Sequence, residues 1–347
     1  MNRGPETKST LNRRRFVKIC AAAAAGLTLT SGLAQARPVL HRWRGIALGA
    51  KAEINLLHED KAKAQELFRL VEAEIRRLEA VFSLYSETSE LTRLNRDGHL
   101  EAPSLDMVNL LALSRRIHAV TEGAFDPTVQ PLWAYYADRA SRGLATDGRG
   151  ARTSELEQVL ERTGFGYVTV EPGLVEFRRK DMALTLNGIA QGYITDRVAA
   201  LLGARGCTDM VVDMGEISAT GDAARSKTPS GRGWPITLRP DPQTTDAAVE
   251  VKIADAAVAS SARTGTTFDQ AGKSSHILDP RTGLPVETDL TAASVIARTA
   301  AYADGLSTAA LVCGEQVLSA ALAHVPEAKA FVVRKDGASG WINKQGS

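Results

Sequence analysis

Hydrophobic residues recur at helical spacing in several parts of the chain. Over residues 61–85 one face is apolar and the other charged, with Leu67, Leu70, Val71, Ile75, Leu78 and Phe82 on the apolar face. This period predicts a long amphipathic helix. A second helix is predicted over residues 104–123, with Ser104 as N-cap and Gly123 just past its end. Further helices are predicted over residues 154–164, 189–206, 301–314 and 315–325.

Alternating or short apolar runs predict strands elsewhere. They cover residues 47–57, two or three segments of 167–188, 209–221 with a break at Gly215, 233–242, 247–260, 291–298 and 328–337. Residues 137–152, rich in Gly and Arg, are predicted as a loop. Long helices combined with mostly antiparallel strand pairs indicate an α+β fold of one domain.

The N-terminus has the organisation of an export signal. Arg13 to Lys18 form a basic cluster, an apolar run follows from Ile19, and Ala34-Gln35-Ala36 fits a signal peptidase site. A membrane anchor is the alternative, but the run is shorter than the roughly 20 residues that span a bilayer. The Arg-Arg-x-Phe-Val-Lys pattern resembles the twin-arginine type. We therefore expect a signal over residues 1–36, a domain over 37–347, a periplasmic location and no stable membrane anchor.

Charge and cysteines narrow the choice of partner. Without residues 1–36 the chain has 36 Lys and Arg against 39 Asp and Glu, a formal charge of −3. No basic stripe with interleaved aromatics remains, so nucleic acid is not expected as a partner. Cys207 and Cys313 could pair or stay as buried thiols, and their spacing, which fits neither a metal nor a redox site, favours thiols.

Two glycine-containing clusters could contact a ligand, the first through a carboxylate that could accept from a ribose, a ring nitrogen or a backbone amide, the second through backbone amides. In "TEGAFDPTVQPL", Asp126 is held at a corner by Pro127, although a helix C-cap followed by an Asp-Pro turn would give the same pattern. In "LTLNGIAQGYITDRV", a strand passes through Gly188 into a helix, whose first backbone amides favour phosphate. A plain strand-to-helix turn is the alternative there.

Two acidic clusters could bind a metal. In "VVDMGEISATG", Asp213 and Glu216 could bind a metal or substrate hydroxyls, or cap a neighbouring helix. In "ADGLST", Asp304 and Thr308 are four residues apart and share a helix face. A carboxylate and a hydroxyl are hard ligands that suit magnesium, whereas an N-cap role for Asp304 is the simpler alternative.

Two histidines are candidates for different roles. In "SSHILDPRTGLP", His276 precedes a turn and is either a catalytic base held rigidly or a residue beside a hairpin corner. His118, in the helix predicted over residues 104–123, is expected to pack or to lie on the surface rather than to bind a ligand.

In their order along the chain, these clusters resemble the ApbE family of FAD:protein FMN transferases. The matching stretches are "FSLYSETSELTRLN", "GAFDPTVQPL", "LNGIAQGYITDRVA", "VVDMGEISATGD", "SSHILDPRTGLPV" and "ADGLSTAALVCG". The resemblance implies a T-fold-like α+β domain. It also implies a magnesium-dependent enzyme that cleaves the FAD pyrophosphate, joins FMN to a threonine or serine of a target protein and releases AMP.

The resemblance also assigns residues. It implies metal ligands at the Ala190 carbonyl, Asp304 and Thr308, and an acid/base at His276. The implied FAD contacts are Tyr85, Ala124, Phe125, Asp126, Asn187, Tyr193 and Ile277. Exported members of the family modify membrane-bound redox subunits, so the resemblance implies such a target. Partly because of its twin-arginine pattern, the chain resembles most the branch associated with nitrous oxide reductase maturation.

The chain departs from the family pattern at three places. Leu48 replaces a methionine, for which we expect a preserved apolar contact with the ligand, and Met214 replaces a glycine. Residues 260–268 lack the usual Ser-Gly followed by an aromatic residue, in a loop that could line the groove for the target peptide. Two other functions stay open: an FAD pyrophosphatase, and a non-catalytic flavin-binding protein of redox-enzyme assembly.

Overall fold

An eight-stranded antiparallel sheet forms the centre of the protein. The computed structural model describes residues 17–19, 38–146, 154–223, 232–239, 248–263 and 275–342. The strand order is β14-β13-β12-β11-β8-β7-β3-β2, and each neighbouring pair is antiparallel. The strands are β2 (Val39–Ala47), β3 (Ala50–His58), β7 (Met210–Asp213), β8 (Ile217–Thr220), β11 (Ala256–Ala262), β12 (Leu290–Ala297), β13 (Lys329–Arg334) and β14 (Ser339–Ile342).

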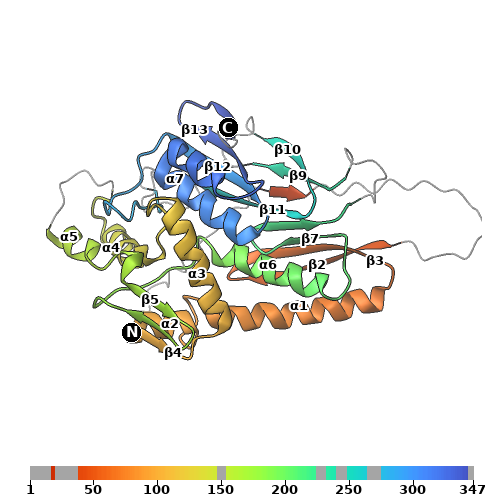
Figure 1. Cartoon of the computed structure of the whole chain (residues 1–347), viewed down its shortest axis with the longest axis horizontal. Helices are drawn as coiled ribbons and strands as arrows, with labels where there is room; N and C mark the ends of the chain where they lie inside the picture. Colours follow the sequence, from red (N-terminus) through yellow and green to blue (C-terminus); the bar gives the residue numbers. More distant parts are fainter. Residues whose placement is uncertain are drawn as a thin grey trace, which may run out of the picture.

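Helices cover one face of this sheet, and a small sheet covers the other (Figure 1). The helices are α1 (Lys61–Phe82), α2 (Glu90–Asp97), α3 (Leu105–Val120), α4 (Gln130–Ser141), α5 (Ser154–Leu160), α6 (Ala190–Gly203) and α7 (Ala300–Ala323). The small sheet has the order β1-β9-β10, from Val17–Ile19, Trp234–Leu238 and Val249–Ile253. A third sheet, β4-β6-β5, comes from His99–Glu101, Leu174–Phe177 and Val168–Glu171. The predicted α+β fold with mostly antiparallel sheets is confirmed.

Both faces of the central sheet are buried along β7, β12 and β13, which explains the nearly continuous apolar sequence of these strands. Successive side chains of a strand point to opposite faces. Accordingly, Val295 of β12 joins the core beneath the helices, whereas Ile296 packs in the core under β9 and β10. The fully buried Trp234 of β9 anchors this second core. The chain is therefore layered as helices, large sheet and small sheet.

Two helix starts follow the sequence prediction. Asp60 caps α1 by accepting from the backbone N–H of Ala62 at 2.7 Å, and Ser104 caps α3 through Met107 N–H at 3.2 Å. The predicted apolar face of α1 is buried, with Leu67, Val71, Ile75 and Leu78 at most 3% exposed. These long, regular stripes made the prediction possible.

Two helices were missed because their apolar stripes are short. α4 occupies part of the segment predicted as a loop over residues 137–152, and only Leu132 and Tyr136 of this helix are buried. α2 has eight residues, of which Leu91 and Leu94 are buried. Two apolar positions do not define a helical period, so packing rather than periodicity identifies these helices.

α7 contains the break that the sequence predicts between two helices. Gly314 has φ +74° inside the helix, and the Thr288 hydroxyl donates to the Leu311 carbonyl at 2.8 Å just before it. Among the helices that the structure describes, α7 alone has the length and mean hydropathy of a membrane span, with 56% of that window buried inside the protein. α7 packs on β11 and β12, as the core helix of a folded domain does.

α6 and α7 cross in unusually close contact. A Cβ atom at Gly192 of α6 would lie 2.4 Å from the carbonyl oxygen of Ala300, so only glycine allows this approach. Asp196 of the same helix accepts from Ala300 N–H at 2.7 Å and from Ala301 N–H at 2.9 Å. Burial raises the pKa of Asp196 to about 6, while these two hydrogen bonds lower it. The α6–α7 pair is the element on which the candidate site is built.

The predicted export signal lies almost wholly outside the described residues. Within it, β1 pairs with β9 in antiparallel register, with Val17 opposite Leu238. Cys207 and Cys313 are both free thiols, as the sequence favours. Cys207 is buried and Cys313 half-buried, and burial raises the pKa of Cys313 to about 12.

Candidate active site

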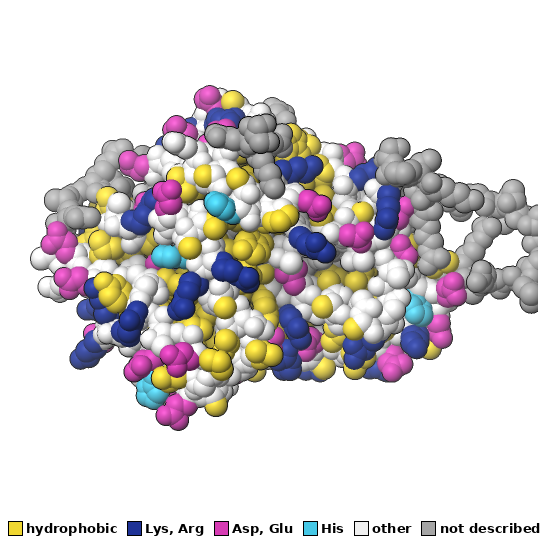
Figure 2. Space-filling model, viewed as in Figure 1, with side chains coloured by type: hydrophobic (Ala, Val, Ile, Leu, Met, Phe, Trp, Pro, Cys, Tyr) yellow, Lys and Arg dark blue, Asp and Glu magenta, His cyan; other side chains and the backbone are white. Residues whose placement is uncertain are grey.

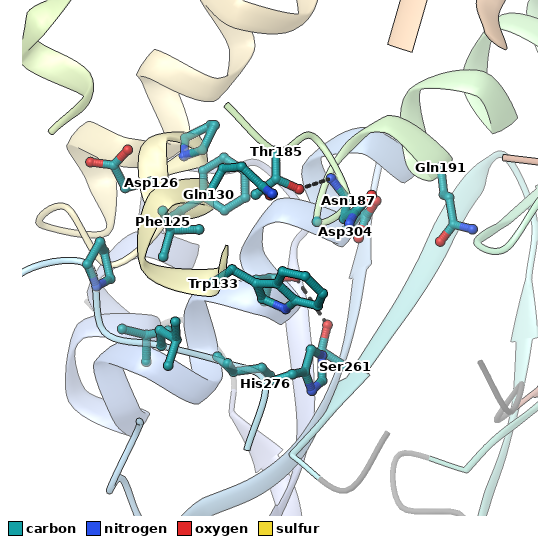
Figure 3. A pocket seen from close by; sticks show the side chains of 18 of the residues that line it. Phe125, Asp126, Gln130, Trp133, Thr185, Asn187, Gln191, Ser261, His276 and Asp304 are labelled. Carbon is teal, nitrogen blue, oxygen red and sulfur yellow. Dashed lines mark hydrogen bonds between the residues drawn. The ribbon is translucent and has the colours of Figure 1, made fainter. Parts of the chain in front are cut away.

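A cavity of about 490 Å³ opens between the N-terminal turn of α4, the N-terminus of α6 and the middle of α7. Its size is that of a small-molecule or cofactor site. Segments distant in the sequence meet in it, and Figure 3 shows Phe125, Trp133, Asn187, Asp304, Ser261 and His276 around the same space. Most of the site residues predicted from the sequence line it: Tyr85, Ala124, Phe125, Asp126, Asn187, His276, Ile277, Asp304 and Thr308.

The acidic group of the cavity is placed by the α6–α7 contact. Asp304 is 4% exposed, and its Oδ2 accepts from the backbone N–H of Gly192 at 3.1 Å. The N-cap of α7 is Thr299, so Asp304 lies in the second turn and the N-cap alternative is wrong. Ala190, the first residue of α6, does not line the cavity, but its backbone belongs to the turn that contacts Asp304.

Thr308 lies one turn after Asp304 and also lines the cavity. A Cβ atom at Gly188 would lie 3.0 Å from Thr308 Oγ1, so the chain entering α6 passes directly over this hydroxyl. The Asn187-Gly188 segment is therefore more than a connection between elements. It brings backbone amides and the α7 oxygens to one wall.

Asp126 lines the cavity, but its carboxylate is engaged by the protein. It accepts from Thr128 N–H at 2.8 Å and from Phe165 N–H at 2.9 Å, and it caps the 3₁₀ turn Pro127–Val129. In Figure 3 the carboxylate points away from Trp133 and Ser261. Burial raises the pKa of Asp126, whereas these hydrogen bonds and His118, whose Nδ1 lies 3.7 Å away, lower it. The Asp126 carboxylate therefore stabilises the Asp-Pro turn, which is the alternative that the sequence left open.

His118 packs, as predicted, and does not line the cavity. Its Nδ1 lies 3.0 Å from the Phe125 carbonyl oxygen, and its ring centroid is 5.8 Å from that of Phe165. Through these contacts His118 supports the loop that carries Ala124 and Phe125.

His276 precedes a turn that is fixed from several directions. Asp279 N–H donates to the Leu284 carbonyl at 2.8 Å, and Gly283, with φ +74°, donates to the Asp279 carbonyl at 2.8 Å. Tyr136 of α4 donates from its hydroxyl to the Gly283 carbonyl at 2.9 Å. The turn is thereby tied to α4, and the half-buried His276 and buried Ile277 are held against the cavity.

Aromatic side chains supply the apolar surface. Phe125 and Trp133 line the cavity from the α4 side, and Tyr85, 75% exposed, lies at its rim. Trp133 and its neighbour Gln130 were missed because α4 was not predicted. The cavity also contains Ser261 and Gln191, which carry no specific sequence signal.

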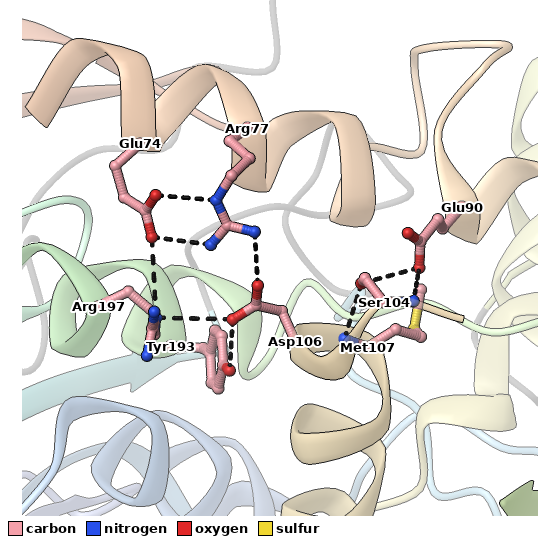
Figure 4. Close-up of polar contacts among 8 residues, drawn as sticks. All are labelled: Glu74, Arg77, Glu90, Ser104, Asp106, Met107, Tyr193 and Arg197. Atoms are coloured by element: carbon pink, nitrogen blue, oxygen red, sulfur yellow. Dashed lines mark hydrogen bonds and ion pairs between the residues drawn. The ribbon is translucent and has the colours of Figure 1, made fainter. Parts of the chain in front are cut away.

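Tyr193 is the predicted FAD contact that the structure places elsewhere. Figure 4 shows it in a polar network that joins α1, α3 and α6. Its hydroxyl donates to Asp106 Oδ1 at 2.8 Å, and Arg77 Nη1 donates to Asp106 Oδ2 at 2.6 Å. The pKa of Tyr193 is raised to about 12, mainly by burial and then by the hydrogen bond to Asp106. With 3.6 residues per helical turn, Tyr193 points to the face of α6 opposite Gln191, which faces the cavity.

The departures from the family pattern have structural roles. Leu48 and Gly49, with φ +45° and +75°, form the two-residue turn between β2 and β3. Leu48 does not line the cavity, whereas nearby Ala50 does line it. Met214 is fully buried in the core, which leaves Gly215 and Glu216 at the cavity wall. Residues 264–268 of the 260–268 segment lie outside the described residues.

Glycine is required at position 215 for a steric reason. Gly215 has φ +119°, and a Cβ atom there would lie 2.8 Å from the Gln191 side chain. The Asp213 carboxylate accepts from Gly215 N–H at 3.0 Å, and the Glu216 carboxylate accepts from Ser260 N–H at 3.2 Å. Within the described residues, no group of three or more His, Cys, Asp or Glu side chains could hold a metal.

The charged side chains among the described lining residues of the cavity are acidic. Asp126, Glu216 and Asp304 line it, whereas none of its described lining residues is a lysine or arginine. Positive potential from the described chain comes from the N-terminal amides of α6 and, when protonated, from His276. On the face seen in Figure 2, by contrast, basic and acidic side chains are mixed.

The fold and cavity define a single-domain α+β protein that can hold an aromatic ligand beside hard oxygen donors and a helix N-terminus. The chain belongs to the ApbE family, whose model matches residues 48–332. It is 28% identical to the FAD:protein FMN transferase of Haemophilus influenzae, over 93% of this chain and 94% of that protein. It is 30% identical to the FAD:protein FMN transferase of Treponema pallidum, over 80% of this chain and 78% of that protein.

A solved structure agrees with this membership. The crystal structure of the Pseudomonas stutzeri flavinyl transferase ApbE, apo form, superposes with a TM-score of 0.71 at 25% identity, over 89% of this chain and 95% of that one.

Proposed function

We propose that this protein is an FAD:protein FMN transferase. It cleaves the FAD pyrophosphate, transfers FMN to a threonine or serine hydroxyl of a target protein, and releases AMP. The observation that carries the proposal is the convergence of Asp304, Thr308, the α6 N-terminus and His276 on one cavity with an aromatic wall. The names of the aligned relatives supply the reaction.

The residues present fit a magnesium ion. A diphosphate entering a cavity lined by three carboxylates, with no Lys or Arg among its described lining residues, requires added positive charge. Asp304 and Thr308 would hold the ion with the Ala190 carbonyl, and these are hard oxygen ligands of the kind magnesium takes. When bound, magnesium supplies charge neutralisation at the phosphate oxygens.

Groups of the protein itself would orient FAD and deprotonate the attacking hydroxyl. The amides at the start of α6 face the diphosphate and favour its negative charge. The aromatic wall of the cavity stacks on the rings of FAD and excludes water from them. It consists of Phe125, Trp133 and Tyr85. The His276 imidazole accepts the proton of the incoming hydroxyl as its oxygen attacks the FMN phosphorus and the bond to the AMP phosphate oxygen breaks.

The same cavity could serve a pyrophosphatase, in which water replaces the protein hydroxyl, or a carrier that holds FAD unchanged. Co-expression with a candidate acceptor, followed by intact-mass analysis, separates the three. A transferase gives the acceptor the added mass of FMN, which is lost when the acceptor threonine is changed to valine. Unmodified acceptor with free FMN would indicate a pyrophosphatase, and unmodified acceptor with intact FAD would indicate a carrier.

We further propose that the enzyme acts in the periplasm on a membrane-bound redox subunit, such as one serving nitrous oxide reduction. The Arg13 to Lys18 cluster and the apolar run after it support export. Replacing Arg13 and Arg14 by lysine should keep the protein in the cytoplasm, as cell fractionation would detect. A protein still found in the periplasm would contradict the twin-arginine route.

A further inference from the structure

The hydroxyl groups of Thr308, Ser261 and Ser307 form a hydrogen-bonded chain that ends at a backbone carbonyl of α7. Thr308 and Ser307 belong to α7, whereas Ser261 belongs to β11. Ser307 Oγ donates to the Asp304 carbonyl at 3.0 Å. Ser261 Oγ of β11 lies 2.8 Å from Ser307 Oγ and 3.3 Å from Thr308 Oγ1. Ser307 is fully buried, whereas Ser261 and Thr308 are half-buried and line the cavity. Ser261 belongs to residues 260–268, the segment that departs from the family pattern, and was not predicted as a site residue.

The chain has only one consistent direction. A hydroxyl has one proton to donate, whereas a carbonyl has none. Ser307 gives its proton to the Asp304 carbonyl, so Ser261 must donate to Ser307. The proton of Ser261 is then used, and the contact with Thr308 requires Thr308 to donate to Ser261.

This direction decides what Thr308 presents to the cavity. With its proton turned toward Ser261, the oxygen of Thr308 keeps lone pairs available to the cavity that Asp304 also lines, and a neutral hydroxyl binds a cation only through a lone pair. Successive hydrogen bonds in a chain also polarise one another, which increases the electron density on the terminal oxygen. The backbone at Gly188 passes over Thr308 and limits its alternatives.

We propose that Ser261 is a positioning residue that orients the Thr308 hydroxyl as a cation ligand. The inference rests on the proposed role of Thr308 in holding a divalent cation. It extends the candidate site from α7 to β11, because Ser261 acts through Thr308 from the strand that packs directly against α7.

Binding of Mn²⁺ to the purified protein with FAD, followed by electron paramagnetic resonance of the free ion, tests this without measuring activity. Ser261→Ala should weaken Mn²⁺ binding by about tenfold, the effect of one well-placed hydrogen bond to a ligand. Ser261→Thr, which keeps the hydroxyl, should bind Mn²⁺ nearly as the parent does. Ser294→Ala is the matched control, because Ser294 is fully buried and pairs with Ser260 at 2.7 Å in the same sheet.

A double-mutant cycle separates this inference from the proposed function. If Ser261 acts through Thr308, the variant Thr308→Val with Ser261→Ala should bind Mn²⁺ no more weakly than Thr308→Val alone. Normal Mn²⁺ binding by Thr308→Val would overturn the metal site itself. Weak binding by Thr308→Val with normal binding by Ser261→Ala, or additive losses in the double variant, would overturn the role of Ser261 alone. Equal losses in Ser261→Ala and Ser294→Ala would assign the effect to general destabilisation and also overturn it.

Discussion

At the scale of the residue, the role of a side chain at the cavity can differ from the role that its residue type suggests. Asp126 is an acidic residue at the cavity, yet its carboxylate serves a turn and the contact with Phe165. Asp304 lies in the second turn of α7, one turn before Thr308, and its carboxylate accepts from the backbone N–H of Gly192 at the start of α6. The packing around each carboxylate distinguishes the two, and the sequence does not contain it.

His276 is the residue whose removal should separate binding from chemistry. In His276→Ala we expect FAD binding to be retained, because the aromatic wall is unchanged, while FMN transfer falls by about 10²- to 10⁴-fold, the usual worth of general base catalysis. Equilibrium dialysis with FAD and a transfer assay measure the two effects. His324→Ala, at an exposed histidine beyond α7, is the control and should transfer normally. Unchanged transfer in His276→Ala would remove His276 from the mechanism.

The residues that the sequence could identify are those with a pattern around them. Asn187, His276, Asp304 and Thr308 each stand in a motif, and the order of the motifs carried the resemblance. Ser261 and Trp133 line the same cavity without such a pattern. Tyr193 stands in a motif but faces Asp106, because a motif gives position along a helix and the packing of three helices decides which face meets the ligand.

At the scale of the element, the α6–α7 pair carries the site. Periodicity predicted both helices, and the break at Gly314 matches the boundary expected between two of them. Their mutual approach depends on Gly192, whose spacing in "GIAQGY" is a weak signal by itself. α2 and α4 were missed because two buried positions in each helix are too few to establish a period.

Gly192→Ala tests the close approach of the two helices. Because the added methyl group would meet the backbone of Ala300, we expect the free energy of unfolding to fall by about 2 kcal/mol or more. Gly203→Ala, at the last residue of the same helix with open space around it, should instead raise stability by about 0.5–1 kcal/mol. Urea denaturation of both variants measures the contrast. Equal effects would contradict the close approach.

Asp196 should make stability depend on pH. Its pKa is raised to about 6 in the folded protein, against about 4 for an unfolded aspartate, so the folded state binds this proton more tightly. The contribution of Asp196 to stability is therefore greatest below about pH 4 and is lost as the pH rises to about 6. In Asp196→Asn this part of the slope should vanish, a change of about 3 kcal/mol at most across that range. Denaturation at several pH values measures it, and parallel curves for the two proteins would contradict the assignment.

At the scale of the whole molecule, one domain provides the cavity, and the large sheet with helices on one face holds its walls together. The α+β class and the single domain followed from the hydrophobic pattern. The strand order could not be predicted, because pairing such as β3 with β7 depends on contacts between segments about 150 residues apart. The family resemblance indicated the function, and the structure showed that most of the predicted site residues line one cavity.

The most direct test of the account is a reaction of purified components: this protein, FAD, magnesium and an acceptor with a single reactive threonine. The account predicts that AMP is released only when the acceptor is present, in a one-to-one ratio with flavin bound covalently to it. Release of AMP together with free FMN, at the same rate with and without the acceptor, would contradict it.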